Sequence, residues 1–389
     1  MIKKDAFGDK SIRVPFFQPY ISKNDKIAVT DALGATLLTD GPILQKFERV
    51  FSIFTKSKFG IGVSNATSAL HLSLKALGIG RGDEVIVPDM TFVATANAVL
   101  ISGATPILAD VDDDMNLSVT SVEQSLTRKT KAIIPVHFAG KVCDIKRLKR
   151  IARTNQLALI EDCAHAIGAK LDGQHVGTFG DVGCFSFYPT KNITTIEGGM
   201  ITTQSKNITE SLKSLRNHGI TKSLVQRYSK GTPWDYDVIE PGYNYRLDEV
   251  RSALGINQLK HIKKLNSLRR KAYEYYNEKL SEVPGILTPK LSKYENHACH
   301  LYIIRVQKEY GISRNQLFKE LLSHGIRTSV HYKPLHQFTI FKKRAKIMDS
   351  IKNSKNIYRQ IISLPLYPTI TPKQQDYVTE SIRNISSTR

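Results

Sequence analysis

The chain has 389 residues, of which 41% are hydrophobic and 23% charged, and its formal net charge at pH 7 is +21. This length is too great for one small core and suggests roughly two globular domains. No apolar stretch is long enough to cross a bilayer, and Met1-Ile2-Lys3-Lys4-Asp5 lacks the apolar run of a signal peptide. We therefore expect a cytoplasmic protein without a membrane partner.

The positive charge is scattered along the chain. Its densest runs are short, and the first of them is interrupted by an apolar residue, as on a solvated helix face: Lys146-Arg147-Leu148-Lys149-Arg150 and Lys342-Lys343-Arg344. No zinc-finger or RRM signature accompanies them. We therefore predict no nucleic-acid partner. A basic surface also suits polyanionic small substrates such as nucleotide diphosphates, or reflects the host's general use of lysine.

The four cysteines, Cys143, Cys163, Cys184 and Cys299, are far apart and have no metal-ligand spacing. We interpret them as reduced core residues. Histidines flank Cys299 at positions 297 and 300, but no second ligand cluster accompanies them, so no metal site is predicted.

The first half of the chain alternates short apolar runs with helical patterns. Residues 1–20 are expected to form an irregular arm, because Pro15 and Pro19 oppose regular structure. The expected strands cover residues 61–63, 84–87, 105–109, 132–136 and 157–160. The expected helices cover residues 22–38, 43–54, 66–77, 92–101, 118–126 and 144–154. Such alternation predicts an α/β fold with a mostly parallel central sheet covered on both faces.

The second half continues the sheet and then changes character. Strands are expected at residues 183–187 and 200–203, and helices at 207–217 and 247–280. Pro284-Gly285 then marks a break. Beyond it the patterns predict strands at 300–306 and 328–331 and helices at 313–324 and 371–384. We therefore divide the chain into a large domain, residues 1–280, and a smaller C-terminal α+β domain, residues 281–389.

Small polar residues follow the first expected strand, in Ser64-Asn65-Ala66-Thr67-Ser68-Ala69-Leu70. They leave the first N–H groups of the next helix open, at the positive end of its dipole, which is a phosphate site. An ordinary capped helix is the simpler interpretation of these residues alone.

Three further positions follow expected strands, where open α/β sheets bind ligands. Phe92 can stack on a flat heteroaromatic ring, or belong to the core. Asp162 can face a ligand and hold a pyridine nitrogen protonated, although Glu161-Asp162 also resembles a helix N-terminus. His165 is placed to brace that carboxylate or to contact a cofactor.

Lys191 lies between an apolar strand and the turn at Gly198-Gly199. A lysine in a rigid, apolar setting loses its proton more easily, and only the neutral amine forms a Schiff base. An ordinary loop lysine is the simpler interpretation of this residue alone. Together, however, a phosphate cradle, a stacking ring, a carboxylate and such a lysine are the four features that pyridoxal 5'-phosphate (PLP) requires. The hydroxyl of Ser186 can add to the phosphate site.

The chain resembles the nucleotide-sugar aminotransferases of the DegT/StrS family, which are fold type I PLP enzymes. The resemblance runs nearly end to end, through Thr39-Asp40-Gly41-Pro42, Ser64 to Leu70, Gly82-Asp83-Glu84-Val85-Ile86, Glu161 to Ala166, Phe185-Ser186-Phe187 with Lys191, Glu197-Gly198-Gly199, and Gly242-Tyr243-Asn244-Tyr245-Arg246-Leu247.

This resemblance implies that Lys191 forms the Schiff base and that Asp162 holds the pyridine nitrogen, while Phe92 stacks on the ring. The phosphate contacts that it implies are Ala66, Thr67 and Ser186. Related dehydratases carry histidine in place of the lysine, so lysine here favours transamination. L-glutamate is then the amino donor and a nucleotide-linked keto-sugar the acceptor. Asn244 is expected to reach the phosphate of a neighbouring subunit, which implies a homodimer with shared sites.

The runs Thr328-Ser329-Val330-His331-Tyr332-Lys333-Pro334-Leu335-His336 and Ser363-Leu364-Pro365-Leu366-Tyr367-Pro368 resemble the members that aminate C4 of UDP-4-keto sugars for glycan biosynthesis. They imply that His331 contacts the sugar and Lys333 the diphosphate, unless both simply belong to a polar loop at the domain junction. GDP-linked 4-keto sugars and 3-keto sugars remain alternatives, as does a non-catalytic sensor of PLP or a nucleotide sugar.

Overall fold

The computed structural model describes residues 11–222, 224–229, 232–291, 295–348 and 350–387. The strands are β1 (Phe59–Val63), β2 (Glu84–Pro88), β3 (Thr105–Ala109), β4 (Thr130–Ile133), β5 (Ala158–Asp162), β6 (Lys170–Leu171), β7 (Gln174–His175), β8 (Val182–Ser186), β9 (Gly199–Thr203), β10 (Ile286–Leu287), β11 (Glu295–Asn296), β12 (Tyr302–Val306) and β13 (Ile361–Leu364).

The helices are α1 (Lys23–Leu33), α2 (Pro42–Thr55), α3 (Ala66–Ala76), α4 (Val93–Ser102), α5 (Val119–Gln124), α6 (Ile145–Thr154), α7 (Lys206–Arg216), α8 (Leu224–Ser229), α9 (Glu249–Leu280), α10 (Arg314–Ser323), α11 (Thr339–Arg344), α12 (Lys352–Tyr358) and α13 (Pro372–Ser387). Short 3-10 turns occur at Phe138–Gly140, Lys308–Tyr310 and Leu335–Gln337.

The main sheet of the described residues has seven strands in the order β1-β9-β8-β5-β4-β2-β3. The five strands from β8 to β3 pair in parallel, whereas β9 runs antiparallel to both of its neighbours. The predicted α/β class with a mostly parallel sheet is therefore confirmed. The carboxyl ends of β2, β5 and β8 meet at one edge, where the predicted ligand-facing residues follow them.

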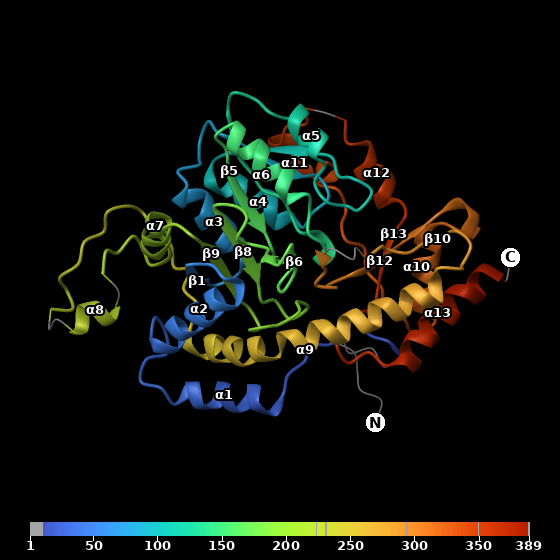
Figure 1. Cartoon of the computed structure of the whole chain (residues 1–389), viewed down its shortest axis with the longest axis horizontal. Coiled ribbons are helices and arrows are strands. Elements are labelled where there is room, and N and C mark those ends of the chain that lie inside the picture. Colours follow the sequence, from blue (N-terminus) through green and yellow to red (C-terminus); the bar gives the residue numbers. More distant parts are fainter. Residues whose placement is uncertain (1–10, 223, 230–231, 292–294, 349, 388–389) are drawn as a thin grey trace.

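Both faces of this sheet are covered by helices, as Figure 1 shows. Side chains alternate along β2 because strands have a period of two: Ile86 packs in the cluster that includes α2, α6 and α9, whereas Val85 and Val87 pack with α3, α4 and α7. All three are fully buried. Because both faces are buried, the strand sequences are continuous apolar runs rather than alternations of apolar and polar residues.

The C-terminal part contains a three-stranded antiparallel sheet in the order β10-β12-β13. A separate core lies between this sheet, α10, α13 and the C-terminal half of α9. The long helix α9 extends beneath both parts of the molecule (Figure 1). The predicted domain division at residue 280 stays a prediction.

Three of the predicted elements differ most from the structure. The strand expected at residues 132–136 is β4, which begins at Thr130 and ends at Ile133. The first helix ends at Leu33 and not at residue 38, because the N–H of Gly34 bonds back to the carbonyls of Asp31 and Ala32 and closes the last turn. The strand expected at residues 328–331 is a single bridge, in which Ser329 and Ser363 exchange backbone hydrogen bonds before the chain turns away.

Some structure was not predicted. Helix α12 and strand β13 lie in a region to which no pattern was assigned, and residues 1–10 of the expected N-terminal arm lie outside the described residues. The segment that carries α8 projects far from the rest of the molecule (Figure 1). Among the described helices, none combines the length and the apolar character needed to cross a membrane.

Candidate functional site

Lys191 lies in the loop between β8 and β9 and lines a pocket together with residues from the C-terminal part, including His300, His331, Tyr332 and Leu364. Its backbone N–H donates to the carbonyl of Tyr188 at 2.9 Å. Burial lowers the pKa of Lys191 to about 8, against the opposing effect of the Asp162 charge. Since an amine with this pKa is about one-tenth neutral at pH 7, Lys191 is a far better nucleophile than an ordinary lysine.

Asp162 is the last residue of β5, and its carboxylate is buried. Thr95 Oγ1 donates to Oδ2 at 2.9 Å, and the backbone N–H of Ala164 donates to Oδ1 at 3.1 Å. Burial raises the pKa of Asp162, whereas these two hydrogen bonds and the charge of Lys191 oppose the rise. The residues after Asp162 form turns and not a helix, which removes the alternative interpretation of this pair.

Thr95, and not His165, braces this carboxylate. The Nδ1 atom of His165 accepts from the N–H of Ala139 at 3.3 Å, and its Nε2 atom lies 3.0 Å from the hydroxyl of Tyr332. Burial and the charge of Lys191 lower the pKa of His165 well below its usual value. His165 is therefore neutral, with its proton on Nε2 facing Tyr332.

The start of α3 is capped by a side chain and also has open backbone N–H groups, so the two interpretations of its sequence are compatible. Asn65 caps the helix, because its Oδ1 accepts from the N–H of Ser68 at 2.8 Å. The N–H groups of Ala66 and Thr67 have no acceptor among the described residues and remain open. A Cβ added to Gly199 would lie 2.6 Å from the backbone of Asn65, so only glycine lets β9 approach this turn.

Ser186 ends β8, and its Oγ accepts a long hydrogen bond of 3.5 Å from the N–H of Tyr188. Phe92 precedes α4 and is 55% exposed, so it does not belong to the core. Its ring lies 5.8 Å from that of Tyr332 at a 50° tilt. The free face of Phe92 is thus available to a flat ligand.

The two predicted substrate contacts differ in position. His331 lines the Lys191 pocket, where its Nδ1 lies 2.7 Å from Ser363 Oγ and its ring stacks on Phe16 at 5.5 Å. Burial and the charge of Lys191 lower the pKa of His331 to about 3. Lys333 is exposed, does not line this pocket, and holds its Nζ 4.8 Å from the centre of the Phe338 ring.

Asn244 is exposed at the base of the projecting segment, where it pairs with Asn217 in an isolated bridge. It does not line the Lys191 pocket of its own chain. Within the described residues, the structure thus gathers Lys191, Asp162, His165 and His331 around one site, as their mutual electrostatic effects show, and leaves Asn244 and Lys333 outside the pocket.

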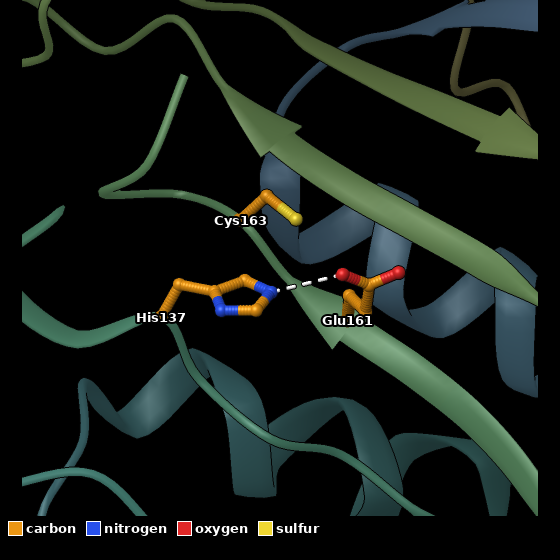
Figure 2. A group of neighbouring side chains, drawn as sticks. All are labelled: His137, Glu161 and Cys163. Carbon is orange, nitrogen blue, oxygen red and sulfur yellow. Dashed lines mark hydrogen bonds and ion pairs between the residues drawn. The ribbon is translucent and has the colours of Figure 1, made fainter. Parts of the chain in front are cut away.

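Figure 2 shows a buried cluster of metal-ligand types, His137, Glu161 and Cys163. Two of its members, Glu161 and Cys163, flank Asp162 in the sequence. Each carboxylate oxygen of Glu161 already accepts two hydrogen bonds. His137 Nε2 (2.9 Å) and the N–H of Gly177 (2.7 Å) bond to Oε2, while the N–H groups of Phe179 and Gly180 bond to Oε1, both at 2.7 Å. Glu161 therefore organises the loop before β8 rather than offering a free ligand atom.

Glu161→Ala is expected to lower the free energy of unfolding by at least about 3 kcal/mol, because it leaves three N–H groups, two of them buried, and the buried His137 without an acceptor. Glu210→Ala serves as the control, since Glu210 is an exposed helix residue 3.7 Å from Lys206, and we expect a change within about 0.5 kcal/mol. Urea denaturation of both variants measures the difference. Equal stability of the two would contradict the role assigned to Glu161.

Sequence reasoning missed four residues of this site: Thr95, Asn192, His300 and Tyr332. Thr95 could have been predicted from the sequence, because it lies three residues after Phe92 on a helix that begins at a strand's carboxyl end. Tyr332 lay inside a quoted run without being singled out. Asn192 and His300 are joined by a contact between residues 108 positions apart, which no local pattern reveals.

A mostly parallel sheet with one antiparallel strand, a loop lysine before that strand and a buried aspartate at the end of β5 define the PLP-dependent aminotransferases of fold type I. Sequence comparison agrees with this class and identifies one family within it. Residues 19–383 match the DegT/DnrJ/EryC1/StrS aminotransferase family, and the chain belongs to this family.

Similar proteins span almost its whole length. The spore coat polysaccharide biosynthesis protein SpsC of Bacillus subtilis is 37% identical, over 96% of this chain and 97% of its own. The putative sugar aminotransferase Spr1654 of Streptococcus pneumoniae, in its PMP-form, superposes with a TM-score of 0.90 at 31% identity, over 97% of this chain and 100% of its own. Helicobacter pylori PseC, an aminotransferase involved in the biosynthesis of pseudoaminic acid, gives 0.89 at 29% identity, over 97% and 100%.

The chain is thus a PLP-dependent sugar aminotransferase, and the residues present suit the cofactor. Two open N–H groups at the positive end of α3 match a phosphate, and the exposed ring of Phe92 matches a pyridine. The buried carboxylate of Asp162 and the readily deprotonated amine of Lys191 match the ring nitrogen and the aldehyde of PLP.

Proposed function

We propose that the enzyme transfers the amino group of L-glutamate to C4 of a UDP-linked 4-keto-6-deoxy sugar or a related 4-keto sugar, for glycan biosynthesis. One contact carries this proposal. The 2.7 Å hydrogen bond between His331 and Ser363 joins the two C-terminal runs that resemble the UDP-4-keto-sugar enzymes, at the pocket of Lys191. SpsC takes part in spore coat polysaccharide biosynthesis and PseC in pseudoaminic acid biosynthesis, and both agree with such a substrate.

The cofactor, when bound, supplies an electron sink that stabilises the negative charge left on carbon when a proton is removed. In our proposal the neutral Nζ of Lys191 takes the proton from Cα of the amino donor and returns one to C4 of the sugar. Asp162 holds the pyridine nitrogen protonated, and Phe92 covers one face of the ring. The open N–H groups of Ala66 and Thr67, with the hydroxyl of Ser186, bind the phosphate.

His331 is placed to orient the sugar. Its pKa of about 3 keeps it neutral, and its Nδ1 is engaged by Ser363, so its Nε2 is the atom left for a substrate hydroxyl. Lys333 lies two residues further along the chain and is exposed. Its flexible side chain can therefore contact the diphosphate of the substrate where that group faces solvent.

The substrate is tested by incubating the aminated enzyme with a matched panel of keto-sugars and identifying the products by NMR. UDP-4-keto-6-deoxy sugars should be aminated at C4 with the highest kcat/KM. A preference for GDP-linked 4-keto sugars or for 3-keto sugars would replace the proposed substrate, and failure with every sugar under conditions where glutamate reacts would favour a sensor.

We further propose that two chains build each active site. Asn244 lies outside the pocket of its own chain and pairs with Asn217, the residue after α7. The segment between these two residues carries α8 and projects from the molecule (Figure 1). This segment exposes large apolar side chains that a second chain would cover, including Trp234 at 74% and Ile239 at 66%. An Asn244 that crosses to the neighbouring subunit would complete the phosphate site there.

Complementation measures this arrangement. Asn244→Ala and Lys191→Ala chains are each expected to be nearly inactive, yet a heterodimer of the two keeps one intact site. Random mixing should therefore restore about one quarter of wild-type activity, because half of the dimers are mixed and half of their sites are whole. Verified heterodimers without activity would show that Asn244 acts within its own chain.

A further inference from the structure

Asn192, the residue after Lys191, is held by three hydrogen bonds to distant parts of the chain. Its Nδ2 donates to Asn266 Oδ1 on α9 and to the carbonyl of Ala298, both at 2.7 Å. Its Oδ1 lies 3.1 Å from Nδ1 of His300. Asn192 is only 3% exposed, so every polar atom of its side chain is satisfied inside the protein.

These contacts fix the orientation of each group. A backbone carbonyl only accepts, so Nδ2 of Asn192 must face Ala298 and its Oδ1 must face His300. Asn266 is oriented in the same way, because its own Nδ2 donates to the carbonyl of Ile167 at 3.0 Å. His300 therefore carries its proton on Nδ1, and the whole set has a single consistent arrangement of donors and acceptors.

The set joins the lysine loop to the C-terminal part. Residues 298–300 lead directly into β12, and His300 lines the same pocket as Lys191. The ring of His300 also lies 4.5 Å from the ring of His165, whose Nε2 faces Tyr332. Residues 188–191 are exposed or half-buried, whereas residues 192–195 are buried. Asn192 is therefore the first buried residue after the lysine, and its hydrogen bonds hold the end of this loop.

We propose that Asn192 is a positioning residue that ties the Lys191 loop to residues 298–300, so that the C-terminal part of the molecule determines where the lysine amine lies in the pocket. The proposal rests on Lys191 being the catalytic lysine. Without this tie, Lys191 is expected to swing toward water. Its amine then regains hydration and holds its proton more strongly.

The test follows the rate at which the cofactor-free protein captures PLP as a function of pH, by visible absorbance. Only the neutral amine reacts, so the rate reports protonation of Lys191 without requiring turnover. None of the variants replaces a titratable group that faces this amine: Asp162, His165, His300 and His331. The wild-type midpoint is expected near pH 8, where burial places the pKa of Lys191 at about 8.

In Asn192→Leu, which has the same shape but no hydrogen bonds, the midpoint is expected to rise by about one pH unit. Capture at pH 7 should then slow about tenfold, and kcat should fall more than KM for glutamate rises. Asn277→Leu is the matched control. Asn277 also bonds through both amide ends, to Tyr302 and Pro289, but lies at the far end of α9, so its midpoint should not move.

A midpoint in Asn192→Leu equal to that of the control would overturn the proposal. If Asn192→Leu does not fold, Asn266→Ala tests the proposal instead. It removes one of the two acceptors of the Asn192 amide and should shift the midpoint in the same direction by less. Borohydride reduction followed by peptide mapping shows whether PLP is bound at Lys191, and so distinguishes a failure of the proposed function from a failure of the role of Asn192. Wild-type protein that captures no PLP at Lys191 contradicts the proposed function, not the role of Asn192 alone.

Discussion

Lys191→Ala should remove transamination while leaving a folded protein. In the proposed mechanism the variant loses the nucleophile that holds the cofactor and the base that moves the proton, and the lost acid–base catalysis alone should cost about 10²–10⁴-fold in rate. The fold should persist, because Lys191 lies in a loop and its backbone bond to Tyr188 does not involve the side chain. Steady-state kinetics with glutamate and a keto-sugar, beside circular dichroism, measure both effects.

Lys149→Ala is the matched control, since Lys149 is an exposed lysine on α6 and should be replaceable without loss of rate. Normal turnover by Lys191→Ala would refute the assignment of this residue. The pH dependence supplies an independent check. A pKa near 8 means that the neutral amine accumulates as the pH rises through 8, so cofactor capture should be slow at pH 6 and level off above pH 9.

The second large effect is expected for Asp162→Asn. The amide has the shape of the carboxylate and can keep the bond from Ala164, but it cannot hold a positive charge on the pyridine nitrogen. We expect kcat to fall by about 10²–10³-fold with the cofactor still bound, since one preorganised electrostatic contact is lost. Kinetics and the PLP content of the purified variant test this outcome.

Thr95→Val provides a graded comparison, because it removes the 2.9 Å hydrogen bond to Asp162 but keeps the carboxylate itself. It also removes the 3.0 Å contact between the hydroxyls of Thr95 and Thr91. Its effect on kcat should be smaller than that of Asp162→Asn and in the same direction. Undiminished activity of Asp162→Asn would show that another group holds the cofactor nitrogen.

Much of the structure of residues 11–280 could be predicted because its signals are local. Fully buried parallel strands read as apolar runs, and the helix that starts at Ala66 follows directly from Asn65 as its cap. The residues expected to face a ligand follow β2, β5 and β8, and topology alone brings the ends of these strands together.

Contacts between distant segments could not be predicted in this way. His331 depends on Ser363, and the expected strand at 328–331 is a single bridge because only Ser329 meets β13. Asn192 depends on His300 in the same manner. Periodicity describes how one segment faces the core, and it carries no information about which side chain of another segment completes a hydrogen bond.

The visible absorbance of the purified protein, recorded with PLP before and after adding L-glutamate, measures whether the protein binds the cofactor and takes an amine from glutamate. We predict a yellow band from the cofactor bound at Lys191 that bleaches to the pyridoxamine form when glutamate donates its amine. A protein that stays colourless after incubation with PLP, or a band that glutamate leaves unchanged, would contradict the account.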